Sequence, residues 1–283
     1  MGKIFEALEK ANREFHRTLP ISRKDARTSD DAVDKDKVVP LLSPNKYNEE
    51  RQLDPNLITH HSPQSIESEL FKVLRTNLLY PSAGSVPKTI LVTSALPGDG
   101  KSLVSANLAI SIAQGVEEHV LLIDCDIRKP SIHSMFGHHQ VIGLSEYLSQ
   151  DRDLSNFILK TPVEKLSIIS GGSPPANPAE LLSSKKMKAL IKDVSGRYED
   201  RFVIIDSPPP SMAAETTAIA NLVDGVIVVV KNGKTPRNAV TELVEQIGKE
   251  KLLGVVLNFF DQSIKKYYGY RKSYDITNKN NSE

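Results

Sequence analysis

The stretch KTILVTSALPGDGKS, residues 88–102, joins an apolar strand to a glycine-rich turn, and the helical pattern LVSANLAISIAQG follows it. Counted back from Lys101, the turn fits the phosphate-loop pattern, except that Ala95 stands where the pattern has its first glycine. Gly98 and Gly100 let backbone N–H groups point inward at a phosphate, and the helix that starts near Lys101 adds its positive end. A plain glycine-rich turn is the alternative, and the strand before it and the helix after it argue against that alternative.

The same turn contains the residues that we expect to bind a nucleotide. Lys101 can reach the β- and γ-phosphates, and the Ser102 hydroxyl can bind Mg²⁺. The predicted contacts are Pro97, Gly98, Asp99, Gly100, Lys101, Ser102 and Leu103. A phosphate loop alone predicts nucleotide binding and leaves the reaction open.

Two further strand ends supply carboxylates for such a nucleotide. In VLLIDCDIRKP, Asp124 ends an apolar strand, and Asp126 and Arg128 follow at alternate positions that can face the same side. In RFVIIDSPPP, Asp206 ends another strand in the manner of a Walker B aspartate, which holds Mg²⁺ directly or through water. Either aspartate alone is as well explained by a helix cap or a turn. Together with the loop, they predict one site at the carboxyl edge of a parallel sheet.

Apolar strands and helix-length segments alternate along the chain from about residue 65. The strand candidates lie at residues 88–94, 119–124, 165–170, 201–206, 224–230 and 251–258. This alternation predicts an α/β fold with a mostly parallel sheet and helices on both faces, as in P-loop NTPases.

The composition excludes several classes of protein. The 36 Lys and Arg residues nearly balance the 35 Asp and Glu residues, so no overall field attracts nucleic acid or an acidic membrane. The single cysteine, Cys125, excludes a disulfide framework and any multi-cysteine metal site within one chain. The apolar runs are shorter than the roughly 18 residues of a membrane-spanning helix, and the start is no secretory signal. We therefore expect a cytoplasmic protein with no direct membrane span.

Composition also divides the chain into regions. Apolar residues at helical spacing near the start, a polar and charged stretch after them, and a polar end rich in tyrosine and lysine surround the α/β part. The predicted regions are an amphipathic N-terminal helix (1–16), a flexible linker (17–64), the P-loop domain (65–264) and a flexible, tyrosine-rich tail (265–283). The first helix is expected to pack on a partner or on its own domain.

The motifs together resemble those of the bacterial tyrosine kinases, which use a Walker-type ATPase fold. The resemblance covers roughly residues 65–275 and includes ALPGDGKS as Walker A, LLIDCDIRKP as Walker A′, FVIIDSPP as Walker B, and the stretches GLSEYL and GGSPPANPAELL. It implies a protein-tyrosine autokinase with ATP and Mg²⁺ as cofactors, which regulates capsule or exopolysaccharide chain assembly. The start MGKIFEALEKA resembles the stand-alone kinases of such loci, which implies recruitment to the inner face of the membrane by a transmembrane chain-length-determinant protein.

The resemblance implies roles for the site residues. The catalytic set is Lys101, Asp124, Asp126, Arg128 and Asp206, and the Mg²⁺ ligands are Ser102, Asp126 and Asp206. Lys101 and Arg128 would neutralise charge that develops during transfer. Asp124 and Asp126 would divide the positioning of Mg²⁺ and the orientation of the tyrosine hydroxyl, in an order that the sequence leaves open. Asn258 is a candidate for the adenine edge, and capping of its strand is the equal alternative.

Members of this family end in a tyrosine cluster, which one subunit presents to the active site of the next. The matching acceptors here are Tyr267, Tyr268, Tyr270 and Tyr274. Binding of RNA or anionic lipid is the alternative for this basic, aromatic tail.

The family also joins subunits into a ring through charged residues on a helix before the sheet. The matching residues are Glu69, Lys72 and Arg75, and Lys72 stands where the family has an arginine. A surface charge cluster within one helix is the alternative. Glu215 stands where we expect an aspartate after Walker B, and its role is left open.

Three competing functions share this fold. Partition and division-site positioning ATPases have a signature lysine at the position of Leu96, and Leu96 argues against that switch. Iron–sulfur carriers need paired cysteines, and the chain has Cys125 alone. A scaffold with a decayed site conflicts with the intact set of lysine, serine and aspartates. The positioning-type ATPase without tyrosine kinase activity is the main alternative.

Overall fold

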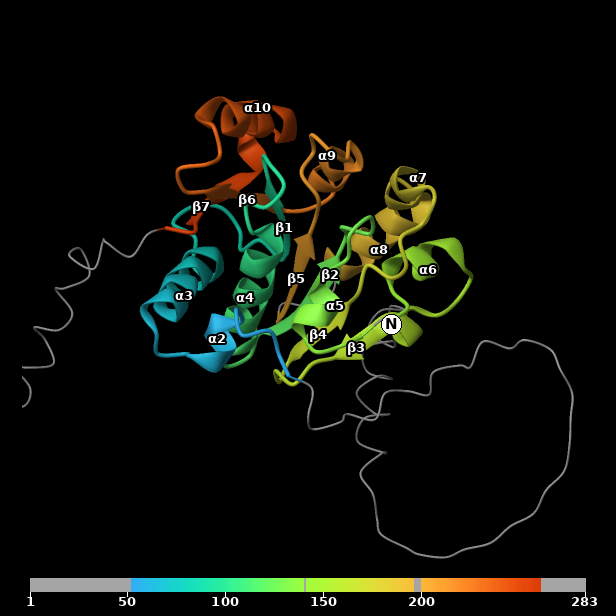
Figure 1. The fold of residues 1–283 in the computed structure, drawn as a ribbon, viewed down its shortest axis with the longest axis horizontal. Helices are drawn as coiled ribbons and strands as arrows, with labels where there is room; N and C mark the ends of the chain where they lie inside the picture. Colours follow the sequence, from blue (N-terminus) through green and yellow to red (C-terminus); the bar gives the residue numbers. More distant parts are fainter. Residues whose placement is uncertain (1–51, 140, 196–199, 261–283) are drawn as a thin grey trace, which may run out of the picture.

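The computed structural model of the chain describes residues 52–139, 141–195 and 200–260. The expected helix at 1–16 and the expected tail at 265–283 lie outside the described residues, as does most of the expected linker. In the described ranges, one seven-stranded sheet has the strand order β3-β4-β2-β5-β1-β6-β7 and helices on both faces (Figure 1). This architecture confirms the predicted α/β fold.

The strands lie where the apolar runs predicted them, with one addition. They are β1 (Thr89–Ser94), β2 (His119–Asp124), β3 (Ile158–Lys160), β4 (Leu166–Ile169), β5 (Arg201–Asp206), β6 (Gly225–Lys231) and β7 (Leu252–Asn258). All neighbouring pairs are parallel except β3 and β4, which are antiparallel. The short edge strand β3 was not predicted, because three residues carry too little periodicity to be recognised.

The helices cover the two faces of the sheet. They are α2 (Ile58–His61), α3 (Ile66–Leu79), α4 (Lys101–Ala113), α5 (Ile132–Met135), α6 (Leu144–Ser149), α7 (Pro178–Leu182), α8 (Lys185–Ser195), α9 (Glu215–Ala220) and α10 (Arg237–Ile247), with 3-10 turns η1 (Leu154–Phe157) and η2 (Lys249–Lys251). The Ser65 hydroxyl accepts a hydrogen bond from Ser68 N and caps α3. In the described ranges, no helix has the length and apolar character that a membrane crossing requires.

Side chains of the central strands alternate between two cores. Leu91 and Ile205 belong to the core under α8, α9 and α10, whereas Ile90 and Ile204 belong to the core under α3 and α4. Both faces are covered, which explains why these strands are continuous apolar runs. Asp124 of β2 and Asp206 of β5 are direct neighbours in the register, so two acidic strand ends meet at one edge.

The folded unit begins earlier than the predicted boundary at residue 65. Leu53 and Leu57 are buried in the core that α4 also joins. Thr59 is buried as well, and its hydroxyl donates to Asn107 Oδ1 of α4 at 2.9 Å. The expectation of a flexible linker is therefore wrong for the described residues 52–64. Two leucines in a polar stretch carry no periodic signal, and only the packed structure shows that they are covered.

Candidate nucleotide and catalytic site

The glycine-rich loop connects β1 to α4 at the carboxyl edge of the sheet. Gly98 and Gly100 have φ angles of 81° and 88°, in the left-handed region that favours glycine. Gly100 is also the N-cap of α4, a helix of 13 residues. The free N–H groups and the positive end of α4 therefore lie next to the loop. The predicted nucleotide contacts from Pro97 to Leu103 thus form one turn and the first turn of α4.

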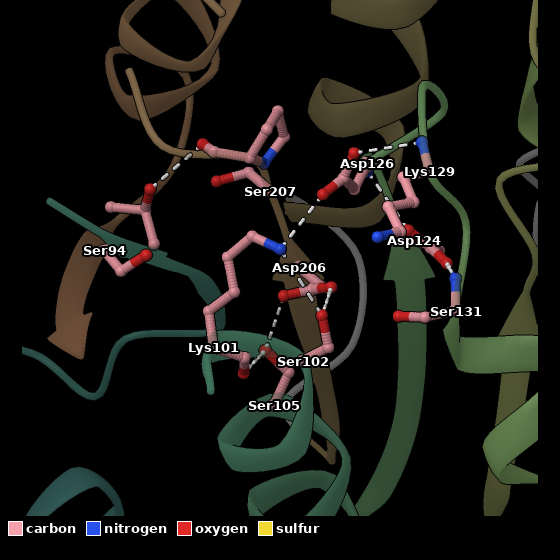
Figure 2. Close-up of polar contacts among 12 residues, drawn as sticks. Ser94, Lys101, Ser102, Ser105, Asp124, Asp126, Lys129, Ser131, Asp206 and Ser207 are labelled. Atoms are coloured by element: carbon pink, nitrogen blue, oxygen red, sulfur yellow. Dashed lines mark hydrogen bonds and ion pairs between the residues drawn. The ribbon is translucent and has the colours of Figure 1, made fainter. Parts of the chain in front are cut away.

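Lys101 and Asp126 form an ion pair at the centre of the site, with 3.0 Å between Nζ and Oδ2 (Figure 2). Asp126 comes from the loop after β2, so the pair connects the Walker A and Walker A′ segments. Burial lowers the pKa of Lys101, but the carboxylates of Asp206 and Asp126 outweigh burial and raise it. The lysine is therefore charged, as phosphate binding requires.

Ser102 and Asp206 make the second contact, with the Ser102 hydroxyl donating to Asp206 Oδ2 at 2.6 Å (Figure 2). Ser105 donates to Asp206 Oδ1 at 3.2 Å, and Asp206 has no exposed surface. Burial raises the pKa of Asp206, and Lys101 and Ser102 oppose this effect. Ser105 was not predicted as a site residue, although it lies one helical turn after Lys101 and therefore on the same face of α4.

Asp124 is an anchor for the loop that follows it. Its carboxylate accepts hydrogen bonds from the backbone N–H groups of Asp126, Ser131 and Ile132 at 3.1, 2.9 and 3.0 Å. The side chain is fully buried, and burial together with the charge of Asp206 raises its pKa to about 8. The two aspartates thus differ: Asp124 holds the Walker A′ turn, and Asp126 reaches Lys101.

A second layer of contacts braces the phosphate loop from outside. The buried Asp99 accepts a hydrogen bond from the Thr235 hydroxyl at 2.8 Å, and its carbonyl accepts one from Asn258 Nδ2 at 2.9 Å. Asn258 Oδ1 also accepts Phe259 N at 2.9 Å. Both polar atoms of the Asn258 amide therefore bind backbone, as the capping alternative requires, and the adenine contact stays a prediction. No sequence signal pointed to Thr235, which belongs to the loop after β6.

Arg128 forms an ion pair with Glu215, the first residue of α9, with 2.8 Å between Nη2 and Oε1. The Glu215 side chain is 2% exposed and that of Arg128 is 42% exposed. Figure 1 shows α9 beyond the carboxyl end of β5, on the same edge as the phosphate loop. The sequence predicted Arg128 as a site residue and left its partner open.

The two stretches GLSEYL and GGSPPANPAELL meet in the folded chain. The Glu146 carboxylate accepts hydrogen bonds from Gly143 N at 2.7 Å and Ser173 N at 3.0 Å. Burial raises the pKa of Glu146, and these hydrogen bonds outweigh burial and lower it. A Cβ on Gly171 would lie 2.9 Å from the Pro130 ring, so this segment packs closely on the Walker A′ loop. The stretches support that loop.

The three charged residues expected at a ring interface lie on α3. Lys72 pairs with Glu69 at 2.8 Å, and Arg75 Nη1 donates to Ser111 O of α4 at 2.7 Å. The Lys72–Glu69 pair fits the alternative of a charge cluster within one helix, whereas Arg75 binds the neighbouring helix α4. The part of the three residues in oligomers stays a prediction.

The remaining candidates concern metals, thiols and acceptors. In residues 52–139, 141–195 and 200–260, no group of three or more His, Cys, Asp or Glu side chains is arranged to hold a metal ion. A Mg²⁺ ion bound together with a nucleotide needs only one or two protein ligands, because phosphate and water oxygens complete its coordination. The hydroxyl of Ser102 beside the carboxylate of Asp206 can supply such ligands. Cys125 is buried. The four candidate acceptor tyrosines lie outside the described residues.

Comparisons with known proteins give a consistent set of relatives. The profile of a family described as "ParA: NUBPL iron-transfer P-loop NTPase" matches residues 85–267. The chain is 35% identical over 227 residues to "Tyrosine-protein kinase YwqD" of Bacillus subtilis (strain 168), a match that covers 80% of this chain and 94% of the relative.

Two solved structures are also similar to this chain. "Crystal structure of the chimerical protein CapA2B2" has a TM-score of 0.67 and 34% identity, and covers 75% of this chain and 92% of that one. "The kinase domain of Escherichia coli tyrosine kinase ETK" has a TM-score of 0.69 and 26% identity, and covers 77% of this chain and 86% of that one.

Proposed function

The chain belongs to the family of bacterial protein-tyrosine kinases, and from this premise we propose that it is an autokinase that phosphorylates its C-terminal tyrosines between subunits. The observation that carries the proposal is the convergence of Lys101, Asp126 and the Ser102–Asp206 pair at the mouth of the phosphate loop. The ParA profile describes the nucleotide-binding fold that these kinases share. The cofactors that fit this site are ATP and Mg²⁺.

The residues of the site divide the work of phosphoryl transfer. MgATP supplies the γ-phosphoryl group that is transferred, and ADP is the leaving group. Ser102 and Asp206 would hold Mg²⁺, and Asp126 is a further candidate ligand. Lys101 would exchange its ion pair with Asp126 for phosphate oxygens and neutralise their charge.

The exchange at Lys101 also defines a role for each aspartate. Once Lys101 turns to phosphate, Asp126 has a carboxylate oxygen free to accept a hydrogen bond from the incoming tyrosine hydroxyl and to orient it. Asp124 keeps three backbone N–H groups and stays an anchor. The orienting role therefore goes to Asp126.

The acceptors and partners follow the family resemblance. The proposed acceptors are Tyr267, Tyr268, Tyr270 and Tyr274, presented by a neighbouring subunit in a ring that involves Glu69, Lys72 and Arg75. Several phosphotyrosines at about −1.5 to −2 charges each would repel one another and favour release of the ring. We propose a transmembrane chain-length-determinant protein as activator, which recruits the kinase to the inner face of the membrane and links it to capsule or exopolysaccharide assembly.

Phosphosite mapping by mass spectrometry tests the proposal. The protein is isolated from its own cells, where any activator is present, in wild-type form and as Lys101→Met. Lys188→Met, at an exposed lysine of α8, is the matched control. We expect phosphate on several tail tyrosines in the wild type and the control, and none in Lys101→Met. Intact ATP turnover in the wild type and the control, with no tyrosine phosphate in either, would refute the autokinase and favour the positioning-type ATPase.

A further inference from the structure

The ion pair between Arg128 and Glu215 joins the segments that follow the two acidic strand ends of the site, β2 and β5. Arg128 lies two residues after Asp126, which contacts Lys101, and Glu215 opens the helix that follows the Walker B strand. The two partners are 87 residues apart in the sequence. A displacement of either loop therefore moves the guanidinium relative to the phosphate loop.

Glu215 is the fixed member of this pair. Its side chain is 2% exposed, and a buried carboxylate without a cation is costly, so the contact is maintained. The next residue, Thr216, donates to Pro208 O at 2.9 Å, and Thr93 of β1 donates to the same carbonyl at 3.2 Å. These bonds tie the start of α9 to the central strands.

Arg128 is the member that can act on a substrate. Its side chain is 42% exposed at the carboxyl edge. The contact to Glu215 uses Nη2, and a guanidinium has five N–H donors in one plane, so it can still bind an anionic oxygen.

We infer that Glu215 is a positioning residue, which orients the Arg128 guanidinium at the rim of the site for the transferring phosphoryl group. This inference rests on the proposed function, in which Arg128 neutralises charge during transfer. Glu215 does not touch the reacting atoms, and all of its effect passes through Arg128. An aspartate at this position is one methylene shorter and would draw the guanidinium toward α9.

A double-mutant cycle on the full-length protein tests this dependence. Glu215→Gln keeps the size of the side chain and removes its charge, Arg128→Gln removes the guanidinium, and the double variant combines them. The rate of ADP formation from saturating ATP is measured, together with the KM for ATP and the thermal midpoint. Glu245→Gln, at an exposed glutamate of α10, is the matched control.

We expect Glu215→Gln to lower kcat about 10- to 100-fold, the range for a displaced catalytic group, with KM changed less than about threefold. In the Arg128→Gln background, the same change should lower kcat no further. Glu215→Asp, which keeps the charge, should recover part of the rate.

Two results would overturn the positioning role. An equal loss in both backgrounds would show that Glu215 acts without Arg128, and a faster rate in Glu215→Gln would show that the pair holds Arg128 away from the phosphate. If Glu215→Gln does not fold, Glu215→Asp is the test. The positioning role then requires a lower kcat in Glu215→Asp at an unchanged thermal midpoint, and a wild-type kcat would overturn it. The assay measures ATP cleavage, so it stays informative if mapping finds no phosphotyrosine and the autokinase fails.

Discussion

Replacement of Leu57 by alanine tests whether the segment before α3 belongs to the folded domain. Leu57 is 0% exposed, in the core that also contains Leu78 and Ile110, and α2 beside it contacts α4. A fully buried leucine loses both its transfer free energy and the packing around it on truncation, which costs about 2–5 kcal/mol. Leu57→Ala should therefore lower the free energy of unfolding by about 3 kcal/mol, the middle of that range.

Urea unfolding of the nucleotide-free protein, followed by circular dichroism, measures this change. Leu70→Ala is the control, because Leu70 lies on α3 and is 44% exposed. The control should change the free energy of unfolding by less than about 0.5 kcal/mol. If Leu57→Ala matches the control, residues 52–64 are a linker and Leu57 is not part of the core.

Three further predictions concern the site. Thr235→Val removes the hydroxyl that binds Asp99, so the Kd for ATP measured by calorimetry should rise about three- to tenfold, and an unchanged Kd would contradict the bracing of the loop. Asp124 has a pKa of about 8 in the folded chain against 3.8 in the unfolded chain, so between these two values folding takes up a proton and stability falls as pH rises. Between pH 5 and 7, urea unfolding should show a fall of about 1.4 kcal/mol per pH unit that Asp124→Asn lacks, and parallel profiles would contradict it. Gly100→Ala puts a Cβ 2.1 Å from Asn258 Nδ2 at a φ of 88°, so calorimetry should show weaker ATP binding, and binding at wild-type strength would contradict the close approach.

The sequence predicted the local features of the fold well. Six apolar runs became strands at the expected positions, and the strand–loop–helix unit around Lys101 has the expected form. Such features depend on neighbours a few residues apart, because side-chain periodicity and glycine placement act locally. Strand β3 was missed because three residues are too few to show a periodic pattern. The buried residues around Leu57 were missed because the sequence around them is polar.

The phosphate loop, the acidic strand ends and the family resemblance could all be recognised before the fold was known, because each resides in a short run of residues whose chemistry depends on spacing. How these residues pair with one another became visible in the folded chain alone. In the fold, Asp126 binds Lys101, and Asp124 accepts hydrogen bonds from backbone N–H groups. Glu215 contacts Arg128, which is 87 residues away in the sequence. Such pairs are set by strand order and by the burial of charge, and both exist only once the sheet has formed.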